Sequence, residues 1–320
     1  MVIGRLAPSP TGAQHLGNAR TFLVAWLSIR QQRGHLILRI EDIDSPRIKS
    51  WATQQAIDDL KWLGLDWDEG PDRPKDQQKY IQSERTPSYE LALRQLKDAE
   101  AVYPCVCTRS DVQEAASAPH EISDGPIYGR TCFHQQVEHS KSLESNFAWR
   151  FRTNENLISF DDGLRGHLQS NVQQELGDFV VYKNDDSPAY QLSVVVDDHE
   201  MGVTEVVRGS DLVPSTFRQL CLYRFFEWPI PRFIHVPLVV GSDGKRLAKR
   251  HGDTRLSHYR DAGISPERII GLLAYSLGWT TQLDEISANE LLDIADLKAI
   301  PSEPFVVGLE QIQWLESGIR

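Results

Sequence analysis

The fold is decided by the first forty residues, MVIGRLAPSPTGAQHLGNARTFLVAWLSIRQQRGHLILRI (residues 1–40). Residues 2–6 predict a short strand that runs into a proline-bounded turn at residues 8–12. Residues 18–33 predict a helix with one apolar face, and a buried strand follows at residues 36–40. The order strand, helix, strand predicts an α/β fold with a parallel sheet of the Rossmann type. The apolar face of the helix is formed by Phe22, Ala25, Trp26 and Ile29.

Both ends of this first helix carry residues typical of helix caps. Asn18 is predicted as the N-cap, because its side chain can accept a hydrogen bond from a backbone N–H of the first turn. Gly34 follows the last turn, as a C-terminal glycine commonly does. An acidic run, EDID at residues 41–44, ends the second strand.

The remaining chain divides into three parts. Residues 103–190 lose the helical period and carry cysteines, short strands and turns, which indicates a subdomain inserted into the sheet. We expect residues 1–102 and 191–255 to form the two halves of the Rossmann fold, and residues 256–320 to form a helical segment. The further predicted strands are 147–151, 192–196, 203–208 and 234–240, and the further predicted helices are 51–63, 87–100, 216–226, 266–277 and 288–294.

Composition is that of a globular enzyme, with 40% hydrophobic and 25% charged residues among 320. A formal net charge of −11 argues against general binding of polyanions, so any contact with nucleic acid needs a local basic surface. No apolar run reaches the roughly 18 residues of a membrane span, and the N-terminus lacks a signal-peptide pattern. We therefore expect a cytoplasmic monomer with no membrane partner.

His15-Leu16-Gly17-Asn18 lies between the first strand and its helix, which is a position suited to phosphate. A helix N-terminus offers unpaired N–H groups and the positive end of a dipole. Gly17 allows a ligand to approach the backbone closely, and His15 can donate a hydrogen bond to a phosphate oxygen. Taken alone, the tetrapeptide is equally consistent with a surface histidine before a helix.

Two arginines and a glutamate predict a pocket for a dicarboxylic amino acid. Arg5 ends the first strand, Arg208 ends the strand at 203–208, and Glu41 follows the second strand. In parallel sheets, ligands bind at these carboxyl ends. Arginine forks suit the two substrate carboxylates and a carboxylate suits the ammonium. Glutamate is the expected substrate; a glutamine pocket would not need both arginines.

The chain resembles the class I glutamyl-tRNA synthetases over about residues 1–300. The resemblance is carried by RLAPSPTG at 5–12, by HLGN at 15–18 and by GSDGKRLAKRHG at 241–252. HLGN is similar to the HIGH signature of that family, and residues 246–250 are similar to its KMSKS loop.

The resemblance implies that both motifs clamp ATP with Mg²⁺, that Lys249 stabilises the reacting α-phosphate and that His15 assists it. The implied ATP-binding residues are His15, Gly17, Asn18, Arg246 and Lys249. Two residues depart from the family pattern, since Arg246 replaces the first lysine of the loop and Ala248 replaces its serine. The resemblance also implies that Ser9 and Tyr190 donate or accept hydrogen bonds in the glutamate pocket, beside Arg5, Glu41 and Arg208.

Three of the four cysteines cluster in sequence, which favours a metal site over a disulfide. Cys105, Cys107 and Cys132 supply three of the four ligands that a structural zinc needs. By chemistry alone His120 and His134 are suitable fourth ligands. The CxC…YxxxC pattern is similar to the zinc site of the glutamyl-synthetase family, which implies Tyr128 as the fourth ligand and leaves His134 as the alternative.

The chain ends at Arg320, soon after the helices that follow the KMSKS-like loop, where we expect no anticodon-binding region. RGSDL at 208–212 carries leucine where full-length synthetases of the family usually have histidine. Together with the cysteine pattern, these features are similar to the short glutamyl-queuosine branch of the family. That branch activates glutamate without tRNA and transfers it to queuosine in the anticodon of tRNA(Asp).

Two alternatives remain open at this point. The chain could charge a tRNA acceptor end, as a glutamyl-tRNA synthetase does. It could instead be an inactive tRNA-binding paralogue, which Arg246 and Ala248 alone favour. The first interpretation, an ATP-dependent ligase that forms glutamyl-adenylate, explains more of the motifs than either.

Overall fold

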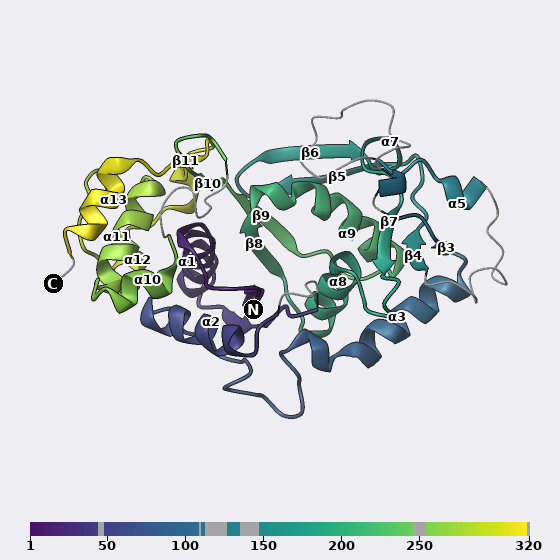
Figure 1. The fold of residues 1–320 in the computed structure, drawn as a ribbon, viewed down its shortest axis with the longest axis horizontal. Coiled ribbons are helices and arrows are strands. Elements are labelled where there is room, and N and C mark those ends of the chain that lie inside the picture. Colours follow the sequence, from purple (N-terminus) through teal and green to yellow (C-terminus); the bar gives the residue numbers. More distant parts are fainter. Residues whose placement is uncertain (44–47, 109, 113–126, 135–146, 246–253, 319–320) are drawn as a thin grey trace.

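The fold is described from a computed structural model in which the parallel strands lie between a helical end and an antiparallel end (Figure 1). None of the described helices has both the length and the apolar character needed to cross a bilayer. The structure describes residues 1–43, 48–108, 110–112, 127–134, 147–245 and 254–318.

Four parallel strands form the centre of the molecule. β1 pairs in parallel with β2, with Ile3 opposite His35, and β8 pairs in parallel with β9. β1 also lies beside β8, because the Thr204 N–H donates to Ile3 O at 2.8 Å. This arrangement confirms the predicted α/β class with parallel strands. The bounds are β1 (Ile3–Leu6), β2 (His35–Leu38), β8 (Glu205–Gly209) and β9 (Arg232–Val236).

Helix α1 (Leu16–Gln31) connects β1 to β2 and is buried over most of its surface. Gly4 permits this packing, because a Cβ at that position would lie 2.5 Å from Cγ1 of Ile29. The predicted N-cap was wrong by three residues. His15 is the N-cap, and Asn18 contributes from the N3 position by accepting from the His15 N–H at 3.3 Å. Histidine is not a usual N-cap, so the sequence favoured the asparagine.

The helices that flank the strands include one that the sequence misassigned. Residues 192–196 were predicted as a strand, but they lie in α8. Their apolar run is buried on all sides, with Leu192 and Val195 fully inaccessible, and such a run fits a buried helix as well as a buried strand. The elements around the sheet are α2 (Ser50–Trp62), η1 (Gln82–Glu84), α3 (Thr86–Asp98), α8 (Tyr190–Glu200), η2 (Ser210–Leu212) and α9 (Val213–Phe225).

The region predicted as an insertion carries its own antiparallel sheet, in the order β3-β4-β7, and a separate hairpin of β5 and β6. The hairpin reaches back to the parallel strands, because the Gly163 N–H donates to Phe233 O at 2.9 Å. The elements are β3 (Val102–Cys105), α5 (Thr131–His134), β4 (Ala148–Phe151), β5 (Leu157–Asp162), β6 (Gly166–Asn171), α7 (Val172–Glu175) and β7 (Phe179–Tyr182).

The C-terminal part is helical, as predicted, and shares one hydrophobic core with α1. The strand predicted at 234–240 is interrupted at Pro237, which has no N–H to donate to a neighbouring strand. Its first three residues belong to β9, and its last two form β10, which pairs in parallel with β11. The elements are β10 (Val239–Val240), α10 (Leu256–Asp261), α11 (Pro266–Ser276), α12 (Ala288–Ile294), η4 (Leu297–Ala299), β11 (Phe305–Val306) and α13 (Leu309–Glu316).

A buried carboxyl joins α2 to the C-terminal helices and makes stability depend on pH. Asp59 is fully buried and pairs with Arg260 at 2.8 Å. Burial raises the pKa of Asp59 to about 6, and the pair with Arg260 only partly opposes this rise. The folded protein therefore holds a proton between about pH 4 and pH 6 that the unfolded chain has released, and stability from this group falls as pH rises.

We expect Asp59→Asn to remove that dependence. The unfolding free energy of the variant minus that of the unchanged protein should increase by about 1–2 kcal/mol as the pH rises from 4 to 7. Urea unfolding at a series of pH values measures this difference. Asp58→Asn, at the exposed neighbour, is the control and should keep most of the pH dependence, because burial is the main cause of the raised Asp59 pKa and the Asp58 charge adds less. An Asp59→Asn difference that is flat with pH would contradict the assignment.

Candidate active site

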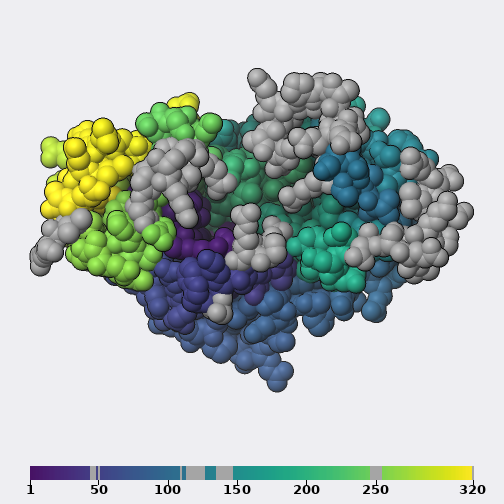
Figure 2. Space-filling model, viewed as in Figure 1, coloured from purple at the N-terminus to yellow at the C-terminus, as the bar shows by residue number. Residues whose placement is uncertain are grey.

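A cavity of about 480 Å³ opens at the carboxyl ends of β1 and β8, beside the start of α1. Figure 2 shows part of the N-terminal segment, in purple, recessed between the C-terminal residues and the teal insertion. Every predicted ATP- or glutamate-binding residue that the structure describes lines this cavity. These residues are Arg5, Ser9, His15, Gly17, Asn18, Glu41, Tyr190 and Arg208.

The start of α1 forms one end of the cavity. Nδ1 of His15 accepts from the Gly17 N–H at 3.1 Å, so in the neutral ring the proton sits on Nε2. Nε2–H is then the donor that can meet a phosphate oxygen. The N–H groups of Leu16 and Gly17 are bonded to Thr254 O and to the His15 ring, so the start of α1 offers a ligand the His15 ring and the positive end of the helix dipole.

The KMSKS-like loop begins and ends near this helix start. The Leu16 N–H donates to Thr254 O at 3.1 Å, and the Leu256 N–H donates to Gln14 O at 2.8 Å. Thr254 is the first described residue after the loop. The predicted ATP-binding residues Arg246 and Lys249 lie outside the described residues.

Arg5 and Arg208 bring two buried guanidinium groups to the cavity. They are only 5% and 4% exposed. Nη1 of Arg5 donates to Val207 O at 3.1 Å, and its Nε lies 3.5 Å from Asp198 Oδ1. Burial lowers the pKa of Arg5, against the opposing charge of Asp198. Both cations therefore have part of their hydrogen-bonding capacity satisfied by the protein, and the remainder is available to a ligand.

Glu41 is held by an arginine that the sequence analysis missed. Arg39 is fully inaccessible, and its Nη2 donates to Glu41 Oε1 at 2.9 Å while its Nη1 donates to Asp198 Oδ1 at 2.6 Å. Burial raises the pKa of Glu41, while Arg39 and Arg5 act in the opposite direction. The predicted ammonium site is therefore a carboxylate already shared with one protein cation. A charged residue inside the apolar strand run LILRI was the sequence signal for Arg39.

The two predicted hydrogen-bonding residues have different environments. Tyr190 is the first residue of α8, and burial raises the pKa of its hydroxyl, so that it remains protonated. Ser9 is exposed at the rim, where its carbonyl accepts from the Thr11 N–H at 2.9 Å. Tyr190 can thus donate to a ligand inside the cavity, and Ser9 lines the same cavity from an exposed position.

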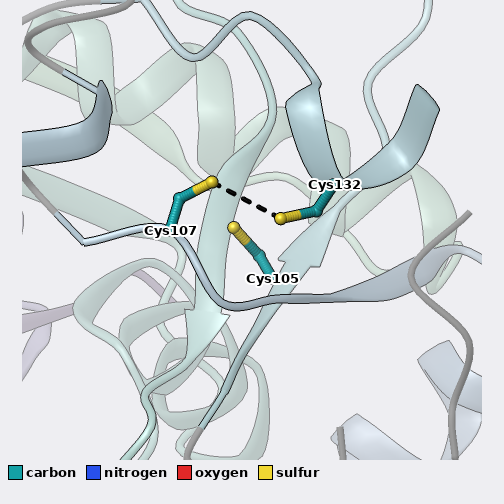
Figure 3. Close-up of side chains that lie close together, drawn as sticks. All are labelled: Cys105, Cys107 and Cys132. Atoms are coloured by element: carbon teal, nitrogen blue, oxygen red, sulfur yellow. Dashed lines mark hydrogen bonds between the residues drawn. The ribbon is translucent and has the colours of Figure 1, made fainter. Parts of the chain in front are cut away.

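Three sulfur atoms converge in the insertion and form a candidate metal centre (Figure 3). The Sγ atoms of Cys105, Cys107 and Cys132 all lie within 4.8 Å of one another, with Cys107 and Cys132 3.4 Å apart. A tetrahedral zinc with thiolate ligands separates its sulfurs by about 3.8 Å, so this donor set fits the ion. Burial, with the neighbouring sulfurs, raises the pKa of Cys107 to about 12, so metal binding must displace a proton.

Of the two predicted fourth ligands, Tyr128 lies beside the sulfur atoms and His134 does not. The Tyr128 hydroxyl lies 3.4 Å from Cys105 Sγ and 3.8 Å from Cys107 Sγ. His134 is exposed on α5 and is not part of the sulfur cluster, and His120 lies outside the described residues. The Tyr128 hydroxyl also accepts from the Cys132 N–H at 2.9 Å, so it stays beside the sulfur cluster, and Tyr128 as the fourth ligand remains a prediction.

Comparisons with known proteins identify the family of this chain. Residues 1–314 match the family described as tRNA synthetases class I (E and Q), catalytic domain. The chain is 52% identical to the Glutamyl-Q tRNA(Asp) synthetase of Rhodopirellula baltica, covering 90% of this chain and 89% of that protein. It is 47% identical to the Glutamyl-Q tRNA(Asp) synthetase of Symbiobacterium thermophilum, covering 99% of both. A glutamate tRNA ligase of Elizabethkingia meningosepticum, solved with its amino acid, superposes with a TM-score of 0.83 at 29% identity, covering 98% of this chain and 68% of that one.

The metal centre predicts about one zinc per chain in protein produced with zinc supplied. Cys132→Ser should lose the metal, because it removes one of three sulfur ligands. Tyr128→Phe should weaken zinc binding by about tenfold or more, since one donor is lost while the sulfurs remain. Elemental analysis and competition with a chelator measure both effects.

The control is Cys221→Ser, because Cys221 donates to Phe217 O from α9 and is not part of the sulfur cluster. This variant should retain full zinc. Protein without zinc above background, or zinc lost equally from the Cys221 variant, would contradict the site.

Proposed function

The chain belongs to the class I tRNA synthetases of the E and Q type, which are ligases, and we propose that it activates L-glutamate with ATP without requiring tRNA. We further propose that it transfers the glutamyl group to queuosine in the anticodon of tRNA(Asp), as the names of its relatives in R. baltica and S. thermophilum suggest. The partners are then ATP, L-glutamate and tRNA(Asp) that bears queuosine.

The main support for glutamate as the substrate is that two buried guanidinium groups and one carboxylate line a single cavity. Nη1 of Arg208 is buried without a hydrogen-bond partner among the described residues. An unpaired donor on a buried cation is costly, and a substrate carboxylate would satisfy it. Arg5 supplies the second cation, and Glu41 supplies a carboxylate for the substrate ammonium. A neutral amide such as glutamine would leave one of the cations without a counter-charge.

The proposed first step joins the two substrates at the α-phosphate. An oxygen of the glutamate α-carboxylate attacks the α-phosphorus, and the bond from that phosphorus to the bridging oxygen of pyrophosphate breaks. Nε2–H of His15, the backbone near Gly17 and Asn18, and the cations Arg246 and Lys249 would stabilise the charge that develops. Mg²⁺ would neutralise the phosphate oxygens.

In the second step a hydroxyl of the modified base attacks the carbonyl of the mixed anhydride and releases AMP. No covalent enzyme intermediate is needed, so the protein has to position the acceptor rather than supply a nucleophile.

We assign a separate proposed role to each part of the chain. Residues 1–102 and 191–255 form the Rossmann halves that hold ATP and glutamate, residues 103–190 form the acceptor-binding insertion, and residues 256–320 form the helical segment toward the tRNA stem. The proposed zinc is structural, because the sulfur cluster joins β3 to α5 and lies away from the residues that line the cavity. Its loss should loosen the insertion before it changes glutamate activation.

The site on the tRNA that receives glutamate distinguishes the proposed activity from charging of the tRNA 3′ end. With radiolabelled glutamate and ATP, we expect label to enter tRNA(Asp) that contains queuosine and to be absent from the same tRNA with guanosine at that position. Glutamate-dependent exchange of pyrophosphate into ATP should proceed without any tRNA. Labelling of tRNA(Glu) at its 3′ end would instead support acceptor-end charging, and exchange that requires tRNA would contradict the activation step.

Lys249→Ala tests the KMSKS-like loop. We expect the variant to lose about 100- to 1,000-fold in kcat for glutamate-dependent pyrophosphate exchange, because one cation at the reacting phosphate is removed. Lys245→Ala is a matched control, since Lys245 is exposed and precedes the loop motif. Equal losses in the two variants would show that general positive charge, rather than Lys249, supports the reaction.

A further inference from the structure

A buried carboxylate–imidazole pair lies behind the glutamate pocket. Asp162, the last residue of β5, and His235, on β9, are both inaccessible through their side chains. Oδ2 of Asp162 lies 2.6 Å from Nδ1 of His235. Neither residue lines the cavity, so neither can touch the substrate.

The surroundings of Asp162 fix it as an ionised acceptor. Its Oδ1 accepts from the backbone N–H of Leu164 at 3.0 Å and from that of Arg165 at 2.9 Å. Burial would raise the pKa of this carboxyl, but the hydrogen bonds from His235 and from the backbone outweigh burial and lower it. A carboxylate that only accepts requires a proton on Nδ1 of His235.

His235 is therefore held as the Nδ1–H tautomer, with a lone pair on Nε2. Burial lowers the pKa of His235 despite the carboxylate, so the ring is neutral. The lone pair on Nε2 accepts from Nε–H of Arg208 at 3.2 Å, and the Thr216 hydroxyl, which can donate to Leu212 O at 3.2 Å, lies 2.8 Å from the same nitrogen. The opposite tautomer would set an N–H against the guanidinium N–H.

This contact orients the guanidinium plane. Nε of Arg208 donates to His235, and Nη2 donates to the Thr216 hydroxyl at 2.6 Å, which leaves Nη1 buried without a hydrogen-bond partner among the described residues. The ring of Phe233 lies 5.2 Å from the guanidinium carbon and supports one face of it. These contacts hold the Arg208 guanidinium in one orientation, so its Nη1 points in one direction.

We propose that Asp162 and His235 are positioning residues that select one imidazole tautomer and thereby aim Arg208 at a carboxylate of the bound amino acid. The inference rests on the proposed function, because it assigns the specificity of the same pocket to residues outside it. It predicts that the acceptor atom at Nε2 matters for glutamate and not for ATP.

Two substitutions at one position separate the acceptor from simple packing. His235→Gln places an amide oxygen near the position of Nε2 and keeps an acceptor for Arg208. His235→Asn places an amide N–H near the position of Nδ1 and keeps the donor to Asp162, but it provides no acceptor for the Nε–H of Arg208. Both remove the ring, and asparagine is one methylene shorter than glutamine, so the ATP KM of each variant serves as the control for a packing defect.

Glutamate-dependent pyrophosphate exchange then gives KM for glutamate, KM for ATP and kcat. We expect the glutamate KM to rise by about tenfold or more in His235→Asn and by no more than about threefold in His235→Gln, with the ATP KM unchanged in both. Equal rises of the glutamate KM in the two variants, or parallel rises of both KM values, would overturn the proposal.

Asp162→Asn tests the tautomer itself. Its amide N–H would donate to Nδ1 and move the imidazole proton to Nε2, where it opposes Arg208, as happens when the aspartate of a serine-protease triad is replaced by asparagine. We expect a raised glutamate KM in this variant. In the unchanged protein, ¹⁵N NMR of the His235 ring should show the neutral Nδ1–H form. This measurement decides the matter even if the variants do not fold, because an Nε2–H ring would refute the proposal.

A wrong substrate assignment gives a different result from a wrong assignment of the Asp162–His235 pair. If the unchanged protein shows no exchange with glutamate but does with another amino acid, glutamate is the wrong substrate. The comparison of His235→Gln with His235→Asn, repeated with that amino acid, still supports or overturns the positioning of Arg208.

Discussion

The pocket depends on one buried guanidinium, that of Arg39 after the end of β2. It is fully inaccessible and lies 2.6 Å from Asp198 and 2.9 Å from Glu41. A buried cation is stable only when carboxylates and hydrogen bonds surround it, and removal of one partner leaves an uncompensated charge. The same three groups therefore hold α8 against the sheet, orient Glu41 toward the cavity and place Asp198 beside Arg5. Structure and substrate recognition share these ion pairs.

This sharing explains why the pocket can hold so many charges out of water. Asp198 partly balances Arg5, and Arg39 partly balances Glu41, so neither Arg5 nor Glu41 faces its full desolvation cost alone. Arg208 differs, because its hydrogen bonds among the described residues are to His235 and Thr216, which are neutral. A carboxylate from a ligand is the counter-charge that its environment lacks. The preference for a dicarboxylic substrate thus follows from an incomplete charge balance.

The insertion contributes to the amino-acid pocket as well as to its expected role with the acceptor. Asp162 belongs to the β5–β6 hairpin, yet it reaches the parallel strands and contacts His235 on β9. The backbone of the hairpin is joined to β9 by the Gly163 N–H. Asp162 therefore joins the hairpin to the element that holds His235 beside Arg208.

The sequence by itself determined the strand–helix–strand opening and the cavity residues at Arg5, His15, Glu41 and Arg208, because periodicity and short motifs are local properties. It could not distinguish α8 from a strand, since residues 192–196 are buried on all sides and show no period. Only the tertiary structure decided which buried charges meet. Arg39 finds Asp198 across 159 residues and His235 finds Asp162 across 73. Such pairs leave no pattern in one sequence, because the chain path alone brings their atoms within hydrogen-bonding distance.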